Sequence, residues 1–170
     1  MRANTLMLSM LLLPLPVLAG QGELSMALKG HALVSHLTLP AADVVGFTHA
    51  PANADEKMAV TNALARLGEA RNVLEPLAEA ACEVTREGVE SGLAPALKQG
   101  APGASLAPGT ARFEARYAWH CAHPEALLAV DVPLLEFLNG VALDTLVITD
   151  QGTRAMLLEP PQTRLPIQRP

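Results

Sequence analysis

The sequence has few aromatic residues and no strong excess of either charge. Aromatic residues make up 3% of the 170 residues, and the single Tyr117, the single Trp119 and the three phenylalanines occupy core-like positions. This leaves no aromatic platform for a ligand. The net charge is -5, with acidic and basic residues interspersed, so no basic stripe could neutralise phosphates. We therefore expect no nucleic-acid partner.

The common short motifs of catalysis are also missing. The sequence contains no GxSxG, HExxH or CxxC pattern, and its glycine-rich stretch 100–109 lacks the Lys-Ser/Thr ending of a phosphate-binding loop. Asp43, Asp55 and Asp131 are interpreted as capping or solvated residues. We expect a protein that is not an enzyme. A hydrolase whose site is assembled from distant residues is the remaining enzymatic possibility.

The only long apolar run lies near the N-terminus, from Leu6 to Leu18, and follows the cationic Arg2. Its 13 residues are interrupted by Pro14 and Pro16, whereas a membrane-spanning helix needs about 20 apolar residues. Small residues follow, so residues 1–19 are predicted to be a cleaved secretory signal peptide. No cysteine follows the cleavage point to accept a lipid. We expect a soluble periplasmic protein with no membrane span.

The only cysteines are Cys82 and Cys121. In an exported protein, an even number of cysteines favours a disulfide. Cys121 lies in register with Tyr117 and Trp119, at the alternate positions that make the buried face of a strand. Closing so long a loop would stabilise the fold by roughly 4 kcal/mol in the chain-entropy model. A cysteine catalyst or metal site is disfavoured, because neither cysteine lies in a CxxC pair or near a helix start.

The rest of the chain, residues 20–160, is predicted to form a single α+β domain with an antiparallel sheet and one disulfide. Asn53 followed by Glu56 three residues later predicts the start of a helix that runs to about Leu67. Alternating apolar residues predict strands. These strands are a hairpin over residues 24–39 with its turn at 29–31, then 82–87, 112–121, 127–132, 143–149 and 154–158.

Two segments are expected to lie outside the regular elements. Residues 88–110 are rich in Gly, Pro and Ala with almost no charge, and they are predicted to form a flexible loop. Residues 161–170 are proline-rich and predict an extended tail. Leu39-Pro40 and Val132-Pro133 each follow an alternating strand, which suggests two similar β-β-α halves with approximate twofold symmetry. A chance match of two short proline-led segments is the alternative.

The five histidines are the only plausible metal ligands, since imidazole suits zinc and copper. His120 and His123 form an HxxH at the end of a predicted strand, where both rings could converge on one ion. His31 and His36 are an odd number of residues apart, so in a regular strand they face opposite sides, and each needs a partner from elsewhere. His49 completes the set. Scattered surface histidines are the alternative, because a single HxxH is a weak signal.

Several segments resemble one known family. Glu23–Gly30, Leu33 to Leu39 and the motif Pro40-Ala-Ala-Asp-Val-Val-Gly-Phe-Thr-His-Ala-Pro51 resemble the opening of the ZrgA-like family, a group of exported proteins associated with zinc uptake. Ala111–Cys121 resembles the second cysteine strand of the family, and Leu127 to Leu158 resembles its C-terminal half. The resemblance covers essentially the whole mature chain.

This resemblance implies zinc binding in the periplasm and cooperation with the solute-binding protein of a zinc importer. Family members carry a histidine cluster after the signal and a His/Asp-rich middle stretch, but residues 20–23 and 88–110 contain no histidine. Only His49 matches a family histidine within a motif, and Thr48 replaces the usual acidic residue. The prediction is a non-enzymatic zinc-uptake accessory protein with reduced or altered metal binding. The alternative is an exported structural or protein-binding module that binds no metal.

Overall fold

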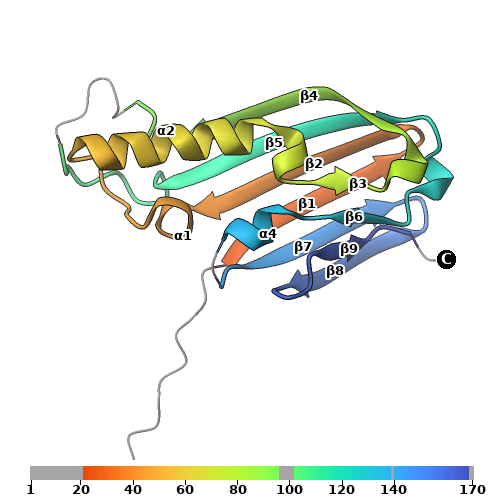
Figure 1. Cartoon of the computed structure of the whole chain (residues 1–170). Helices are drawn as coiled ribbons and strands as arrows, with labels where there is room; N and C mark the ends of the chain where they lie inside the picture. Colours follow the sequence, from red (N-terminus) through yellow and green to blue (C-terminus); the bar gives the residue numbers. More distant parts are fainter. Residues whose placement is uncertain (1–20, 96–101, 139, 169–170) are drawn as a thin grey trace, which may run out of the picture.

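The computed structural model describes residues 21–95, 102–138 and 140–168, and their largest element is a six-stranded sheet. The strand order across this sheet is β4-β5-β2-β1-β7-β8 (Figure 1). The strands are β1 Gln21–Lys29, β2 Ala32–Pro40, β4 Cys82–Ser91, β5 Arg112–Cys121, β7 Ala142–Thr149 and β8 Gly152–Leu158. All neighbours are antiparallel except β1 and β7, which run parallel. The predicted α+β class with a mainly antiparallel sheet is confirmed.

The predicted hairpin is formed by β1 and β2. Leu24 pairs with Leu37 and Leu28 pairs with Leu33, and these four leucines are buried. The turn contains Gly30 with a φ of 56°, a conformation that glycine adopts without steric cost. Alternation of apolar and polar residues therefore placed both strands correctly.

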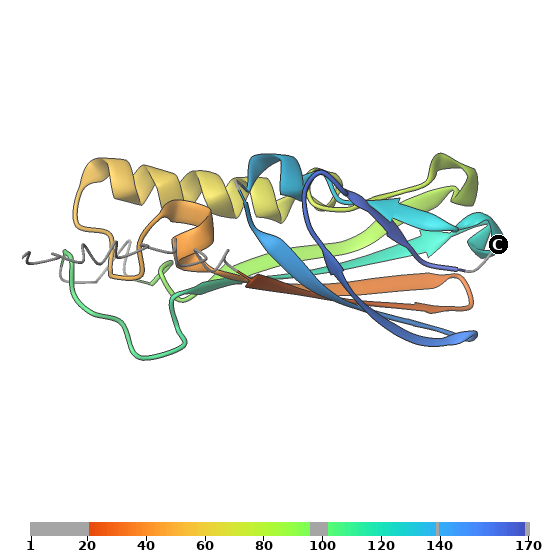
Figure 2. The same ribbon diagram turned by 90° about the horizontal axis from the view of Figure 1, so that it is seen from below.

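Helices and a second, smaller sheet cover one face of the large sheet. The helices are α1 Ala41–Val45, α2 Ala54–Gly68 and α4 Leu134–Phe137. The small sheet has the order β3-β6-β9, formed by β3 Glu75–Pro76, β6 Ala129–Asp131 and β9 Arg164–Pro166. Figure 2 shows these elements on the same side of the large sheet. We call this side of the six-stranded sheet the covered face.

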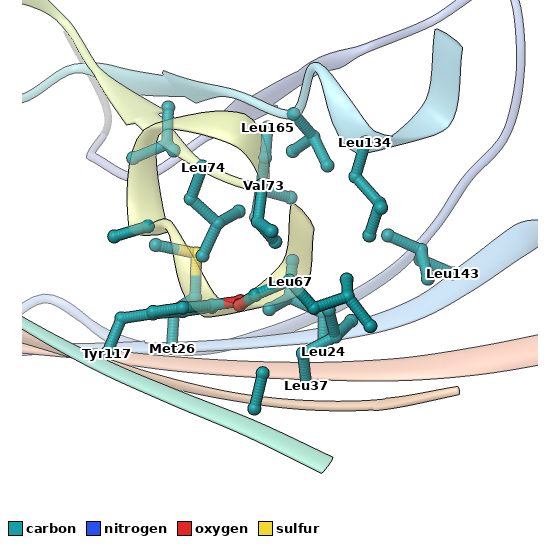
Figure 3. Packing of buried hydrophobic residues seen from close by; sticks show 14 of the residues in the cluster. Leu24, Met26, Leu37, Leu67, Val73, Leu74, Tyr117, Leu134, Leu143 and Leu165 are labelled. Carbon is teal, nitrogen blue, oxygen red and sulfur yellow. The ribbon is translucent and has the colours of Figure 1, made fainter. Parts of the chain in front are cut away.

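The hydrophobic core fills the space between the two layers. Leu24 and Leu37 of the sheet lie beside Leu67 of α2, and Leu165 of β9 lies on the far side of the same cluster, near Val73 (Figure 3). The most deeply buried large residues include Phe113, Leu24, Met26, Leu33, Leu37, Leu39, Leu74, Leu93, Leu127, Leu134, Leu143 and Leu158. The core thus joins residues from almost every element of the chain.

The aromatic residues only partly follow the prediction that all of them are core residues. Phe113, Tyr117 and Trp119 lie on the covered face of β5 and are buried. Phe137, by contrast, is 50% exposed. The guanidinium carbon of Arg66 lies 4.0 Å from the centroid of its ring, a cation-π contact that keeps the ring at the surface.

Helix α2 starts where the sequence predicts. The side-chain oxygen of Asn53 accepts a hydrogen bond from the Glu56 backbone N–H at 2.9 Å, and Glu56 in return accepts one from the Ala52 N–H at 2.6 Å. The helix contributes Val60 and Leu67 to the core. Its last residue is Gly68, and Glu69 follows in an extended conformation.

A buried hydroxyl links this helix to the sheet. The Tyr117 hydroxyl donates a hydrogen bond to the backbone carbonyl of Leu67. Burial raises the pKa of the Tyr117 phenol well above its ordinary value, and the nearby Glu87 carboxylate raises it further. Tyr117 therefore stays protonated and remains a hydrogen-bond donor.

The predicted disulfide between Cys82 and Cys121 is confirmed. The two residues are direct partners in the antiparallel pairing of β4 with β5. Cys121 is fully buried, as its register with Tyr117 and Trp119 predicted. The bond closes a sequence separation of 39 residues at one end of the sheet.

The prediction that residues 88–110 form a loop outside the core is wrong in part. Strand β4 continues to Ser91, because β5 offers hydrogen-bonding partners along its whole length. Leu93 is fully buried, and Leu106 packs against the core. Ser105 forms an isolated bridge with His49. Residues 96–101 lie outside the described residues.

The C-terminal segment also differs from its prediction. Residues 161–170 were expected to form an extended tail, but Arg164–Pro166 form strand β9 and pair with β6. Leu165 and Ile167 are buried, so this segment is part of the second layer. Arg164 forms a bidentate ion pair with Asp131 on β6, with N–O distances of 2.7 and 2.9 Å.

The two segments expected to form an internal repeat share only a proline followed by a short helix. Pro40 and Pro133 each stand immediately before a short helix, α1 and α4. The strands that precede them belong to different sheets, however, because β2 lies in the six-stranded sheet and β6 in the small one. The predicted signal peptide, residues 1–19, lies outside the described residues. Among the helices that the structure describes, none is long and apolar enough to cross a membrane.

Candidate functional site

The face of the six-stranded sheet opposite the helices carries the side chains that do not enter the core. We call it the open face. Strand alternation gives it Glu23, Ser25 and Ala27 on β1, because Leu24 and Met26 point into the core. Its other members on the described strands include Val34, His36 and Thr38 on β2, Glu114, Arg116 and His120 on β5, and Asp144, Leu146 and Ile148 on β7.

The structure brings together two of the five histidines, His31 and His120. Their ring centroids lie 5.4 Å apart and their planes differ by 23°. The Nδ1 atom of His31 is 2.8 Å from the backbone carbonyl oxygen of Cys121. Because a carbonyl oxygen only accepts, His31 Nδ1 is the donor of this hydrogen bond, and Nε2 takes no part in it. Metal-binding histidines commonly have this arrangement, with one nitrogen fixed by a carbonyl and the other free for the ion.

Sheet pairing explains why these two rings meet. His31 lies in the turn between β1 and β2, and its carbonyl accepts a hydrogen bond from the Cys121 N–H at 2.8 Å. Ala32, the next residue, is paired with His120 on β5. The Cys82–Cys121 disulfide adjoins this point, and Glu83 is the partner of His120 on the other side. The histidine pair therefore lies at the end of the sheet where the disulfide joins β4 to β5.

The other three histidines each have a separate environment. His36 lies on the open face, with Nε2 3.9 Å from Glu114. His49 stacks on Phe47, with ring centroids 5.1 Å apart, and its Nδ1 lies 3.8 Å from Glu56. His123 faces Glu125 at 3.7 Å. These are histidine–carboxylate contacts at or near the surface.

The histidine pair by itself supplies two of the four ligands that zinc usually takes. Among residues 21–95, 102–138 and 140–168, no group of three or more His, Cys, Asp or Glu residues is arranged to hold a metal ion. The prediction that His120 and His123 share one ion stays a prediction.

A hollow of about 640 Å³ lies on the open face between β2, β1, β7 and β8. Glu23 and Asp144 are direct partners across the parallel β1–β7 pair, so their two carboxylates line the hollow side by side. His36, Leu146 and Ala155 are among the other residues that line it. The volume lies within the range of small-ligand and side-chain pockets.

Sequence reasoning missed part of this geometry. The alternation of residues in β1 and β7 was sufficient to assign Glu23 and Asp144 to the side away from the core. Their pairing was not predictable, because it depends on a parallel contact between the first and seventh strands. The same holds for His31 and His120, which meet only through the β2–β5 register.

A family model described as "ZrgA family zinc uptake protein" matches residues 18–167. The matched range includes all strands and helices described above, together with the five histidines and both cysteines. A search of curated proteins found no match.

Proposed function

Because the chain belongs to the ZrgA family of zinc uptake proteins, we propose that it is a periplasmic, non-enzymatic accessory protein that binds zinc weakly and reversibly. The family match over residues 18–167 is the observation that carries this proposal. The residues that would hold the ion are His31 and His120. Their neutral imidazole nitrogens are suitable zinc ligands, at the usual Zn–N distance of about 2.0–2.1 Å.

We expect modest affinity, because the two rings are stacked 5.4 Å apart and one must turn before a nitrogen of each reaches the same ion. His31 Nδ1 is already held by a carbonyl, which leaves Nε2 as the nitrogen of this ring that can bind an ion. Two protein ligands leave two coordination positions to water, which another protein can replace. This is what an accessory protein needs if it passes zinc on. The partner that we propose is the solute-binding protein of a zinc importer.

Calorimetric titration with zinc tests the site. The protein purified after expression of the full chain should bind zinc with micromolar affinity, and His31→Ala and His120→Ala should each weaken binding about tenfold or more. His123→Ala distinguishes this pair from the predicted HxxH pair of His120 and His123, because His123 Nδ1 lies 3.7 Å from Glu125. An unchanged affinity in this variant supports His31 and His120, and a loss equal to that of His31→Ala would remove the pair from the proposal.

Export is tested separately by mass spectrometry of protein recovered from the periplasm. The proposal expects a chain that begins near Gly20 and carries no free thiol, because the cysteines are joined. An intact leader on protein found in the cytoplasm would contradict it.

The alternative function is a protein-binding module that uses the same scaffold without metal. The specific observation that favours it is the exposed apolar surface of the open face, with Val34 at 46% and Ile148 at 44% exposure. The absence of any heat change in the zinc titration would put this alternative first.

A further inference from the structure

The open face carries an apolar band that crosses four strands. Val34 of β2 is paired with Ala118 of β5 on one side and with Ala27 of β1 on the other, and Ala27 is paired with Ile148 of β7. Leu146 and Ala155 are paired in the next row. Among the described residues, four of the seven exposed large hydrophobic side chains lie on this one face, namely Val34, Leu146, Ile148 and Leu157. A contiguous exposed band of this kind usually marks an interaction surface.

We infer that a second copy of this chain covers the open face, so that two six-stranded sheets pack face to face. The size of the face suits this partner. Six strands about 4.8 Å apart and about eight residues long give a face of roughly 750 Å², which is close to the roughly 800 Å² per partner of a stable interface. Two twisted sheets pack in this way about 10 Å apart in β-sandwiches.

The charges on β1 and β7 are self-complementary. Glu23 and Asp144 lie side by side at one end of the apolar band, and like charges in direct opposition destabilise a sheet unless a cation joins them. Lys29 lies on the same strand as Glu23, six residues further on and on the same face, beyond the other end of the band. One strand therefore carries the acid and the base on opposite sides of an apolar centre.

A twofold axis that runs across the strands brings these charges together. We place this axis over Met26 and Val147, which are partners in the β1–β7 register. Each row of residues in one copy then faces the row of the partner that lies at the same distance on the other side of the axis. The partner's Lys29 then lies opposite Glu23 and Asp144 and enters the hollow that these carboxylates line. In the same arrangement Ile148 faces the partner's Leu146, so the apolar centre closes on itself.

This inference rests on the apolar band and on Glu23, Asp144 and Lys29, and not on the zinc proposal, although His120 also lies on the open face. The first test is the molar mass of the purified protein over a range of concentrations, by sedimentation equilibrium. The wild-type protein should form a dimer, and Ile148→Lys should weaken the dimer about a hundredfold, because it places a charge in the apolar centre. Met58→Lys is the matched control, since Met58 is 57% exposed on α2, on the other side of the sheet.

Charge reversal tests the proposed axis. Glu23→Lys and Lys29→Glu should each weaken the dimer about tenfold, and the double variant should recover most of the loss, because the ion pair is restored with its signs exchanged. Circular dichroism of each variant shows whether it is folded.

Three results would overturn the inference. The first is a wild-type protein that stays monomeric at every concentration, which would leave the face to a different partner. The second is a dimer that Ile148→Lys leaves intact. The third is a double charge reversal that recovers nothing, which would exclude the axis described here.

Discussion

The two faces of the six-stranded sheet are made by the same strands but differ in what they do. On the covered face, Leu33 and Leu37 are almost fully buried beneath α2 and the small sheet. On the open face, one residue away along β2, Val34 is 46% exposed and His36 meets only a carboxylate at 3.9 Å. At the end of the sheet the same step separates Cys121 from His120.

This difference in burial separates, along each strand, the residues that stabilise the fold from those whose side chains are available for binding. The covered face holds the contacts that offset the entropy of folding, so its residues are constrained by packing. The open face holds the charges, the hollow and the apolar band, and it adjoins the histidine pair. A substitution on one face should therefore change stability, and a substitution on the other should change binding.

The largest loss of stability should come from removing the disulfide. Replacing both Cys82 and Cys121 with serine should lower the free energy of unfolding by about 4 kcal/mol, because the unfolded chain gains the freedom of a loop that the disulfide closes. Denaturant unfolding measures the change. The wild-type protein under reducing conditions should behave like the double variant, and an unchanged midpoint in both would refute the expectation.

The next effect compares neighbours on β2. Leu37→Ala should lower the free energy of unfolding by about 3 kcal/mol, since it leaves a cavity in the core. His36→Ala should change it by no more than about 0.5 kcal/mol, because this side chain faces outward. Equal losses in urea unfolding would mean that the two faces are not energetically distinct.

A smaller effect should follow from removing one buried oxygen. Tyr117→Phe keeps the ring but leaves the Leu67 carbonyl without its hydrogen-bond donor, which should cost about 1–2 kcal/mol. Thermal unfolding of the two proteins side by side measures it. A variant as stable as the wild type would show that the link between α2 and β5 depends on packing alone.

The smallest effect concerns a polar contact at the rim of the covered side. The hydrogen bond and charge of Arg164 lower the pKa of the Asp131 carboxyl, so the ion pair stabilises the fold above the ordinary carboxyl pKa. This contribution is lost as the pH falls below about 4, through the lowered pKa of the folded state. Asp131→Asn should therefore cost less than about 1 kcal/mol at pH 7, since the pair is exposed.

Thermal unfolding at pH 7 and at pH 3 measures this difference for Asp131. The difference in stability between the wild type and Asp131→Asn should be smaller at pH 3 than at pH 7. A gap that widens on acidification would reverse the sign of the argument.

Patterns within short stretches of sequence predicted the elements whose structure depends on neighbouring residues. Alternation located the β1–β2 hairpin and β5, and the Asn53 and Glu56 pair located the start of α2. The disulfide was predictable because Cys121 shared the buried register of its strand. Each of these signals lies within about ten residues of chain.

The missed elements depend on distant partners. Strand β9 has only three residues, among prolines, and is a strand because β6 offers it an edge. The last part of β4 contains Gly88, and this part of the strand stays extended because β5 pairs with it. His31 and His120 looked unrelated for the same reason, since the register between β2 and β5 cannot be read from either segment alone.

The parallel contact between β1 and β7 also affects the order in which the molecule can be completed. Residues 21–27 pair with residues 142–148, so the first strand stays open along one edge until most of the polypeptide is present. Contacts between such distant segments slow folding, because a long loop must close first. A polypeptide that emerges from its first residue onward therefore could not complete this sheet before β7 had emerged.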